Sequence, residues 1–167
     1  PSVFVQANSL VFSGDGLDDH MDAHDSNKFS FTDGSHDKPF TISTWVKPSS
    51  LPTSAQMIVS KYDAAPNREW ALGQRYSGKV EMTLYDVDGY GQMRATSDIV
   101  LSSGTWTHVV ATYDGRGGNK AAAGINFYIN GKLVSTPAAG TNAYTCMSNT
   151  RALVSLGRPD GGGATFN

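Results

Sequence analysis

The sequence predicts an all-β protein in which short antiparallel strands form a sandwich or a barrel. Several segments alternate apolar and polar residues with a period of two, as strands do, and no segment holds a helical period of 3.6 residues. Turn signals such as Gly14-Asp15-Gly16 and Asp88-Gly89 separate these segments at intervals of roughly 8–12 residues. The 18 glycines and 7 prolines among 167 residues also favour frequent turns.

The clearest strand runs from Phe40 to Val46, where apolar and polar positions alternate until Pro48 ends the run. His108–Tyr113 is mostly apolar at both alternating sets of positions, as in a central strand. Ile125–Ile129 leads into Asn130-Gly131, a pair that favours the tight turn of a β-hairpin. The other expected strands, in order, are Ser9–Phe12, His20–Ala23, Met57–Lys61, Trp70–Gln74, Val80–Tyr85, Gln92–Thr96, Lys132–Val134 and Ala152–Leu156. Thr136–Thr150, rich in small and polar residues, is expected to be a long surface loop.

Composition excludes several classes of partner. The chain has 13 Lys+Arg against 15 Asp+Glu, for a net charge of −2, so it lacks the clustered basic face that nucleic-acid binding needs. No apolar run approaches the roughly 20 residues of a membrane span, and no signal peptide is recognisable. The one cysteine, Cys146, excludes an internal disulfide. These values fit one globular domain.

Four segments, Ser9–Met21, Lys38–Pro48, Gly104–Gly115 and Phe127–Lys132, resemble in order and spacing the laminin G-like, concanavalin A-type jelly roll that lectins, glucanases and pentraxins share. They are similar to the family's "SLxFdGxdDYV", "pFTisaWVkp", "WtHvaatydg" and "lYvNGk". The resemblance implies a two-sheet antiparallel jelly-roll sandwich, with residues 1–167 as a single laminin G-like domain. It leaves the function open, because this fold carries lectins, adhesion modules, enzymes and viral structural proteins.

The chain departs from the family pattern in two places. The family's closing strand, "G-x-IDDVRIYN", has no counterpart before the sequence stops at Gly161–Asn167. We therefore expect either that the chain is a fragment or that a neighbouring chain completes the open sheet edge. In addition, His20 replaces the tyrosine that follows Asp-Asp in the family.

The sequence does not favour an enzyme. Glucanases of this fold resemble one another in a Glu-x-Asp-x-x-Glu strand, whose alternate carboxylates serve as nucleophile and acid/base. This chain has two glutamates, Glu69 and Glu81, and Thr83 stands where the central aspartate would follow Glu81. We expect no catalytic residues and interpret the acidic residues as turn formers and solvated charges.

A structural calcium ion is the cofactor that the sequence favours. Asp15, Asp18 and Asp19 cluster in a glycine-containing loop, and calcium prefers carboxylate and carbonyl oxygens. The resemblance adds that related folds often carry calcium near the rim of the sandwich. The alternative is that these aspartates form a turn and cap neighbouring amides.

Glycan binding is the functional hypothesis, because sugars offer apolar C–H faces and many hydroxyls to aromatic rings and polar side chains. If Trp70, Tyr85 and Arg94 lie on neighbouring strands, they share one face. For each aromatic residue the alternative is packing in the core or at a rim. Trp45 and Trp106 are expected to be structural. The full set of candidate ligand-binding residues is Arg68, Trp70, Arg75, Tyr76, Tyr85, Tyr90 and Arg94.

Two functions remain open. The first is a non-catalytic carbohydrate-binding or adhesion module, with calcium assisting and a glycan or glycoprotein surface as partner. The second is a structural protein of a multimeric assembly, such as a viral capsid decoration or a tail fibre, made without a signal peptide and completed by neighbouring copies. Both place the protein at an extracellular surface or in a virion particle.

Overall fold

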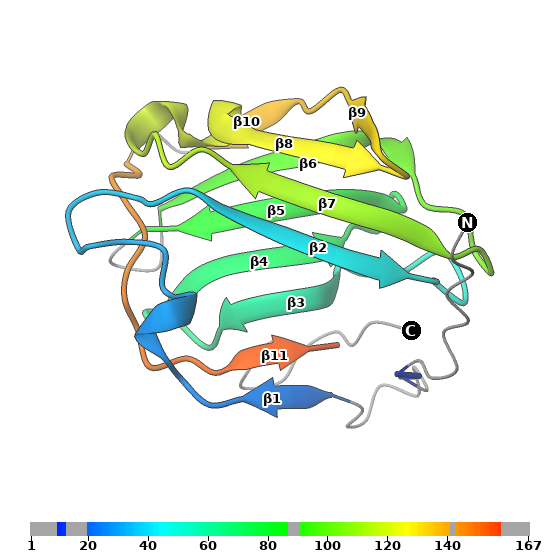
Figure 1. Cartoon of the computed structure of the whole chain (residues 1–167), viewed down its shortest axis with the longest axis horizontal. Coiled ribbons are helices and arrows are strands. Elements are labelled where there is room, and N and C mark those ends of the chain that lie inside the picture. The colour runs from blue at the N-terminus through cyan, green and yellow to red at the C-terminus, as the bar shows by residue number, and fades with distance from the viewer. Residues whose placement is uncertain (1–9, 13–19, 87–90, 141–142, 158–167) are drawn as a thin grey trace, which may run out of the picture.

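Two antiparallel sheets lie face to face in a computed structural model that describes residues 10–12, 20–86, 91–140 and 143–157 (Figure 1). The seven-stranded sheet has the order β1 (Met21–Ala23), β11 (Val154–Leu156), β3 (Gln56–Tyr62), β4 (Arg68–Gln74), β5 (Lys79–Tyr85), β6 (Gln92–Val100) and β10 (Ala138–Gly140). The four-stranded sheet has the order β2 (Phe40–Val46), β7 (Thr107–Tyr113), β8 (Ile125–Ile129) and β9 (Lys132–Val134). Two short 3₁₀ helices, η1 (Asn27–Phe29) and η2 (Gly118–Gly124), lie outside the sheets.

The expected all-β sandwich is confirmed, with differences at the ends of the chain. Residues 10–12 form no strand, so the strand expected at Ser9–Phe12 is wrong for the part that the structure describes. The expected strand at Gln92 extends to Val100 as β6, and β10 pairs with it although the sequence pattern did not indicate β10.

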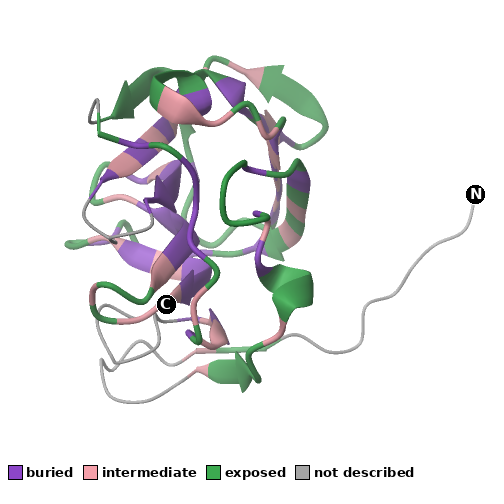
Figure 2. Ribbon diagram, turned by 90° about the vertical axis from the view of Figure 1, so that its left-hand side faces the viewer, coloured by how far each residue is buried: buried purple, intermediate pink, exposed green. Residues whose placement is uncertain are grey.

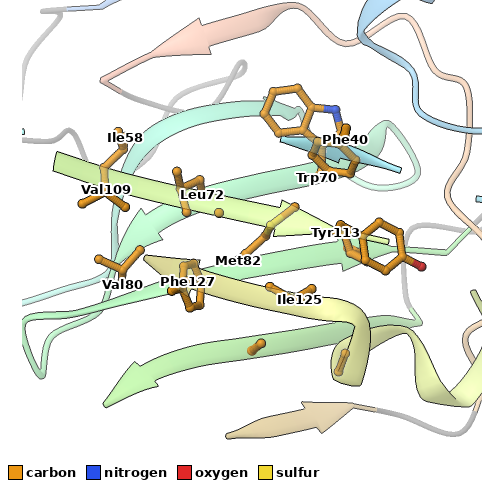
Figure 3. Packing of buried hydrophobic residues seen from close by; sticks show 14 of the residues in the cluster. Phe40, Ile58, Trp70, Leu72, Val80, Met82, Val109, Tyr113, Ile125 and Phe127 are labelled. Carbon is orange, nitrogen blue, oxygen red and sulfur yellow. The ribbon is translucent and has the colours of Figure 1, made fainter. Parts of the chain in front are cut away.

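The core fills the space between the sheets with side chains from alternate positions of each strand. Leu72, Val80 and Met82 of the large sheet face Val109 and Phe127 of the small sheet, and all five are buried (Figure 3). A slip of one residue in any strand would turn these side chains to solvent, so burial of the core fixes the register of both sheets. The outer positions of β2 are exposed, whereas β4 and β5 are buried at nearly every position of both faces.

Like β9, β2 is an edge strand of the four-stranded sheet among the described residues. This strand pairs with β7 along its whole length, from Phe40 opposite Tyr113 to Val46 opposite Thr107, and no described strand lies on its other side. At the far end of the large sheet, β1 pairs with β11.

The segment from Tyr144 to Ala152 is not the surface loop that the sequence predicted. It runs along the end of the sandwich from β10, at one edge of the seven-stranded sheet, to β11 near the other edge (orange in Figure 1), and Figure 2 looks onto this end. Tyr144, Met147 and Ala152 are almost fully buried. Three buried carboxylates hold its backbone, and their acceptor contacts are 2.6 Å from Thr145 N to Asp86, 2.7 Å from Met147 N to Asp37 and 2.5 Å from Thr150 N to Glu69.

The interpretation of the acidic residues as turn formers is thus wrong for Asp37, Glu69 and Asp86, each 7% exposed or less. Composition does not distinguish a solvated carboxylate from one that accepts buried N–H groups. The interpretation is correct for Asp33, whose Oδ1 accepts from Ser35 N and His36 N at 2.9 and 2.8 Å. These two hydrogen bonds also lower the pKa of Asp33.

Lys61 supplies the positive charge at the centre of this anchoring network. Its Nζ lies 2.8 Å from Glu69 and 2.9 Å from Asp25, and it donates to the carbonyl oxygens of Thr150 and Ala152 at 3.0 and 2.9 Å. The Lys61 and Glu69 side chains are both fully buried. Such a pair is costly to break, because the remaining charge stays in a medium of low dielectric constant.

We therefore predict that Lys61→Met lowers the free energy of unfolding by roughly 3–5 kcal/mol, because Glu69 remains buried without its ion partner. Urea denaturation followed by tryptophan fluorescence measures this change. Lys132→Met is the matched control, since Lys132 is exposed in β9. The double variant Lys61→Met/Glu69→Gln, whose neutral amide oxygen can still accept from Thr150 N, is expected to recover part of the loss. An unfolding midpoint of Lys61→Met equal to that of the control would contradict the role assigned to the pair.

Candidate functional site

The outer face of the seven-stranded sheet gathers most of the predicted ligand-binding residues. Pairing in register places Ala71, Thr83 and Arg94 side by side on β4, β5 and β6. We call this surface the arginine face and define it by Tyr62, Arg68, Arg75, Glu81, Thr83, Tyr85 and Arg94. The alternation of β5 explains why it forms, because Val80, Met82 and Leu84 enter the core and the residues between them point outward.

Small residues leave room at the centre of the arginine face. Ala71 and Gly73 of β4 line a shallow hollow together with Met57, Glu81 and Thr83 from the neighbouring strands. A side chain at Gly73 would meet the carbonyl oxygen of Gln56 at 2.5 Å, so the hollow depends on glycine there.

A tyrosine–arginine cluster lies on the same face where β3 and β5 end and β4 begins. The rings of Tyr62 and Tyr85 lie 5.2 Å apart and nearly edge to face, and the Arg68 guanidinium lies 4.9 Å from the Tyr62 ring centre and 5.8 Å from that of Tyr85. Cation–π attraction holds a guanidinium in this position. Burial, with a smaller contribution from Tyr62, raises the pKa of Tyr85 to about 12, so its phenol stays protonated at physiological pH. The cluster thus holds a guanidinium over the partly exposed ring of Tyr62, whereas the ring of Tyr85 is 9% exposed.

Glu81 is held by its neighbours on the same face. Its carboxylate lies 3.4 Å from Arg75 Nη1 and accepts from Thr96 Oγ1 at 3.0 Å. The other side of the Arg75 guanidinium lies 5.7 Å from the ring of Tyr76, which is 67% exposed. The carboxylate of Asp86, five residues after Glu81, accepts hydrogen bonds from Thr145 at the end of the sandwich. This environment suits Glu81 as an acceptor of hydrogen bonds.

Arg94 is the charged group of this face that is best placed for a ligand. It is half-buried between Thr83 of β5 and Ala139 of β10, both of which are short. Among the ion pairs of the described residues, none involves Arg94. The Arg94 side chain is partly exposed on this face, and its guanidinium has donors to offer.

The expectation that Trp70 shares a face with Tyr85 and Arg94 is wrong. Trp70 is 3% exposed, its indole Nε1 donates to the carbonyl oxygen of Phe29 at 2.9 Å, and its ring packs against Phe31 and Phe40 in the core. The reason is the alternation of β4, which turns Trp70 inward together with Leu72. Tyr90 and the proposed calcium ligands Asp15, Asp18 and Asp19 lie outside the described residues.

The two tryptophans expected to be structural are the exposed ones. Trp45 is 56% exposed and Trp106 is 47% exposed, both at the four-stranded sheet. The signal was present in the sequence, because Trp45 alternates with Phe40 and Ile42 and shares its side of β2 with Thr41 and Ser43.

A second, wider hollow of about 520 Å³ opens at the end of the sandwich beside the anchored segment. Its lining includes Asn67, Asn149 and the exposed Arg151. This volume is in the range of small-molecule sites.

Within the described ranges, no group of three or more His, Cys, Asp or Glu side chains could hold a metal ion. No described helix has the length and apolar character to cross a membrane.

Comparisons with known proteins agree on the fold. A family model described as the concanavalin A-like lectin/glucanases superfamily matches residues 15–167. Comparison with curated protein sequences gives no match. The CBM40 of Ruminococcus gnavus IT-sialidase bound to α2,3-sialyllactose is 18% identical with a TM-score of 0.56, covering 80% of this chain and 71% of that chain. The same CBM40 bound to α2,6-sialyllactose has a TM-score of 0.54 at 18% identity, covering 80% and 72%. Domains LG4-5 of the mouse laminin α1 chain have a TM-score of 0.48 at 16% identity, covering 98% of this chain and 41% of that chain. The expected laminin G-like jelly roll is confirmed.

The raised pKa of Tyr85 predicts a loss of stability at high pH. The unfolded phenol loses its proton near pH 10, whereas the folded one keeps it until about pH 12. The stabilisation is therefore complete below pH 10 and is lost as the pH rises toward 12, by roughly 3 kcal/mol in all. Burial raises the pKa of Tyr113 and Tyr144 as well, so these residues add to the loss of stability at high pH. Denaturation at several pH values is expected to show a shallower decline for Tyr85→Phe than for the wild type. Parallel curves would contradict the burial assigned to Tyr85.

Proposed function

Since the chain belongs to the concanavalin A-like lectin/glucanase superfamily, we propose that it is a non-catalytic glycan-binding module that uses its arginine face. One observation carries this proposal above the others. The outer face of the large sheet brings together two tyrosine rings, hydroxyl groups and three arginines around a floor of small residues.

The chemistry of the face matches that of a sugar. The apolar C–H face of a pyranose ring packs on aromatic surface, which the partly exposed Tyr62 and the exposed Tyr76 supply. Sugar hydroxyls need donors and acceptors, which Thr83, Glu81 and Arg94 supply on the neighbouring strands. The small side chains of Ala71 and Gly73 leave the ring space to approach the sheet.

The charge of the face favours glycans that carry a carboxylate or a sulfate. Arg75 is paired with Glu81, whereas Arg94 has no ion pair among the described residues. A guanidinium binds a carboxylate with two parallel hydrogen bonds. Sialyllactose, the ligand in the CBM40 structures named above, carries such a carboxylate. This likeness supports an acidic glycan as the ligand.

We predict that Arg94→Ala weakens binding of sialyllactose or a sulfated oligosaccharide roughly 10- to 100-fold, the cost of a lost charge-assisted hydrogen bond. Arg68→Ala is expected to weaken it to a similar extent. Glycan-array binding followed by calorimetry measures the change, with Lys132→Ala on the other sheet as the charge-matched control. Binding that both arginine variants retain but Arg151→Ala loses would place the ligand in the end hollow and contradict the assignment. Absence of binding to every acidic glycan tested would contradict the function.

We also propose a structural calcium ion held by Asp15, Asp18 and Asp19. If calcium is bound there, adding calcium raises the thermal unfolding midpoint and a chelator lowers it, because a ligand that binds only the folded state stabilises that state. The triple variant with asparagine at the three positions is expected to lose this response. A wild-type midpoint that a chelator leaves unchanged would exclude the calcium site.

A structural role in an assembly, such as a viral decoration or fibre at an extracellular or virion surface, is the second candidate. The observation that favours it is the edge of β2, whose seven residues carry no charge and no bulge that would discourage strand addition. Self-association through this edge would appear as a mass that depends on concentration in equilibrium sedimentation.

A further inference from the structure

We propose that the outer face of the four-stranded sheet is a second carbohydrate platform, built for a neutral glycan and centred on Trp45. We call this surface the tryptophan face. Its outward-facing residues are Thr41, Ser43, Trp45, Trp106, His108, Val110, Thr112, Asn126, Tyr128 and Leu133. The proposal goes beyond the function assigned to the arginine face, because it concerns the opposite side of the sandwich and another ligand.

The structure holds the Trp45 ring in a defined position. Trp45 lies opposite His108 in the β2–β7 pair, and their rings stack at 5.0 Å with an interplanar angle of 26°. A hydrogen bond of 2.9 Å between Ser43 Oγ and His108 Nε2 fixes the imidazole beneath the indole. A ring that is already oriented loses little conformational entropy when a ligand binds.

The other ring face of Trp45 is accessible. β2 is the outermost strand of its sheet among the described residues, so no neighbouring strand there covers the indole on the side away from His108. The indole is 56% exposed as a result. Trp106 precedes His108 by two residues, on the same side of the sheet, and is 47% exposed. The stacked Trp45 and His108 rings thus form an aromatic strip across β2 and β7, and the exposed Trp106 directly precedes β7.

The outward residues of β2, β7 and β8 around this strip are uncharged, and the nearest charge along the chain is the exposed Lys47, one residue after β2 ends. Thr41 and Ser43 of β2, Thr112 of β7 and Asn126 of β8 present hydroxyls and an amide on the same face. No Asp, Glu, Lys or Arg occupies an outward position of β2, β7 or β8. Aromatic rings beside neutral donors and acceptors match a neutral sugar, with its apolar C–H face and its hydroxyl groups. The arginine face, with its guanidinium groups, offers the contrasting surface.

A module with both platforms would hold an acidic glycan on one side and a neutral polysaccharide on the other. The two faces point away from each other across the core, so one ligand does not obstruct the other (Figure 1). Such a protein bridges two glycans, and its apparent affinity for a surface that displays both rises by multivalency.

The test measures depletion of the protein onto insoluble cellulose and chitin, together with fluorescence titration by their soluble oligosaccharides. We expect Trp45→Ala to weaken binding at least roughly tenfold, the scale of a lost central aromatic contact. Arg94→Ala is expected to bind these neutral probes as the wild type does, which separates this site from the arginine face. Lys132→Ala, at the hairpin of the same sheet, is the control for surface charge.

Three outcomes would overturn the proposal. The first is that neither neutral probe binds, and the second is that Trp45→Ala binds as tightly as the wild type. The third is a dimer in equilibrium sedimentation that Trp45→Ala dissociates, because the face would then be a contact between copies. The unfolding midpoint of Trp45→Ala is expected to stay close to that of the wild type, since the side chain is exposed, and this verifies that a loss of binding is not a loss of fold.

Discussion

Three buried carboxylates bind the backbone between Tyr144 and Ala152 and thereby close one end of the sandwich. The remaining architecture depends on these hydrogen bonds. Asp86, Asp37 and Glu69 accept the backbone N–H groups of Thr145, Met147 and Thr150 in turn. Each bond satisfies a donor that would otherwise be buried without a partner. Tyr144 and Met147 belong to the core cluster. Without these hydrogen bonds, the segment would not hold the two side chains between the sheets.

Closing the end in this way leaves both outer faces available. The inner side of each sheet is committed to the core, and strand alternation decides which side chains remain outside. On the large sheet these are tyrosines, arginines and small residues. On the small sheet they are tryptophans, a histidine and neutral polar residues. The two surfaces therefore differ in charge although one rule of alternation generates them both.

The period-two pattern predicted the strands and the sandwich, because burial of one face imposes that pattern locally. It also predicted that Tyr85 and Arg94 share a face, since they lie on consecutive strands joined by a short connection. The tryptophans were misassigned for a different reason. Trp70 was predicted to bind a ligand because polar residues surround it in the sequence, and Trp45 was predicted to be structural because of the family resemblance. The relevant signal was whether each residue stands at an inward or an outward position of its strand.

The anchoring network was beyond the reach of sequence patterns. Lys61 and Glu69 are eight positions apart on two strands, and their partner Thr150 is more than eighty residues away from either. Neither residue stands in a motif, and a lysine is almost never fully buried unless it is paired. The same limitation applied to the segment 144–152, whose small polar residues are typical of a loop until the three carboxylates are placed beside it.

The two proposed uses of the small sheet compete for one ring. A strand added to the free edge of β2 would extend the sheet past Trp45, and its outward side chain would occupy the ring face that a sugar needs. Association at the edge and glycan binding at the tryptophan face are therefore mutually exclusive at Trp45. By linkage, each then weakens the other by the same factor. The arginine face lies on the other sheet and shares no residue with β2, so its glycan affinity is independent of whether that edge is covered.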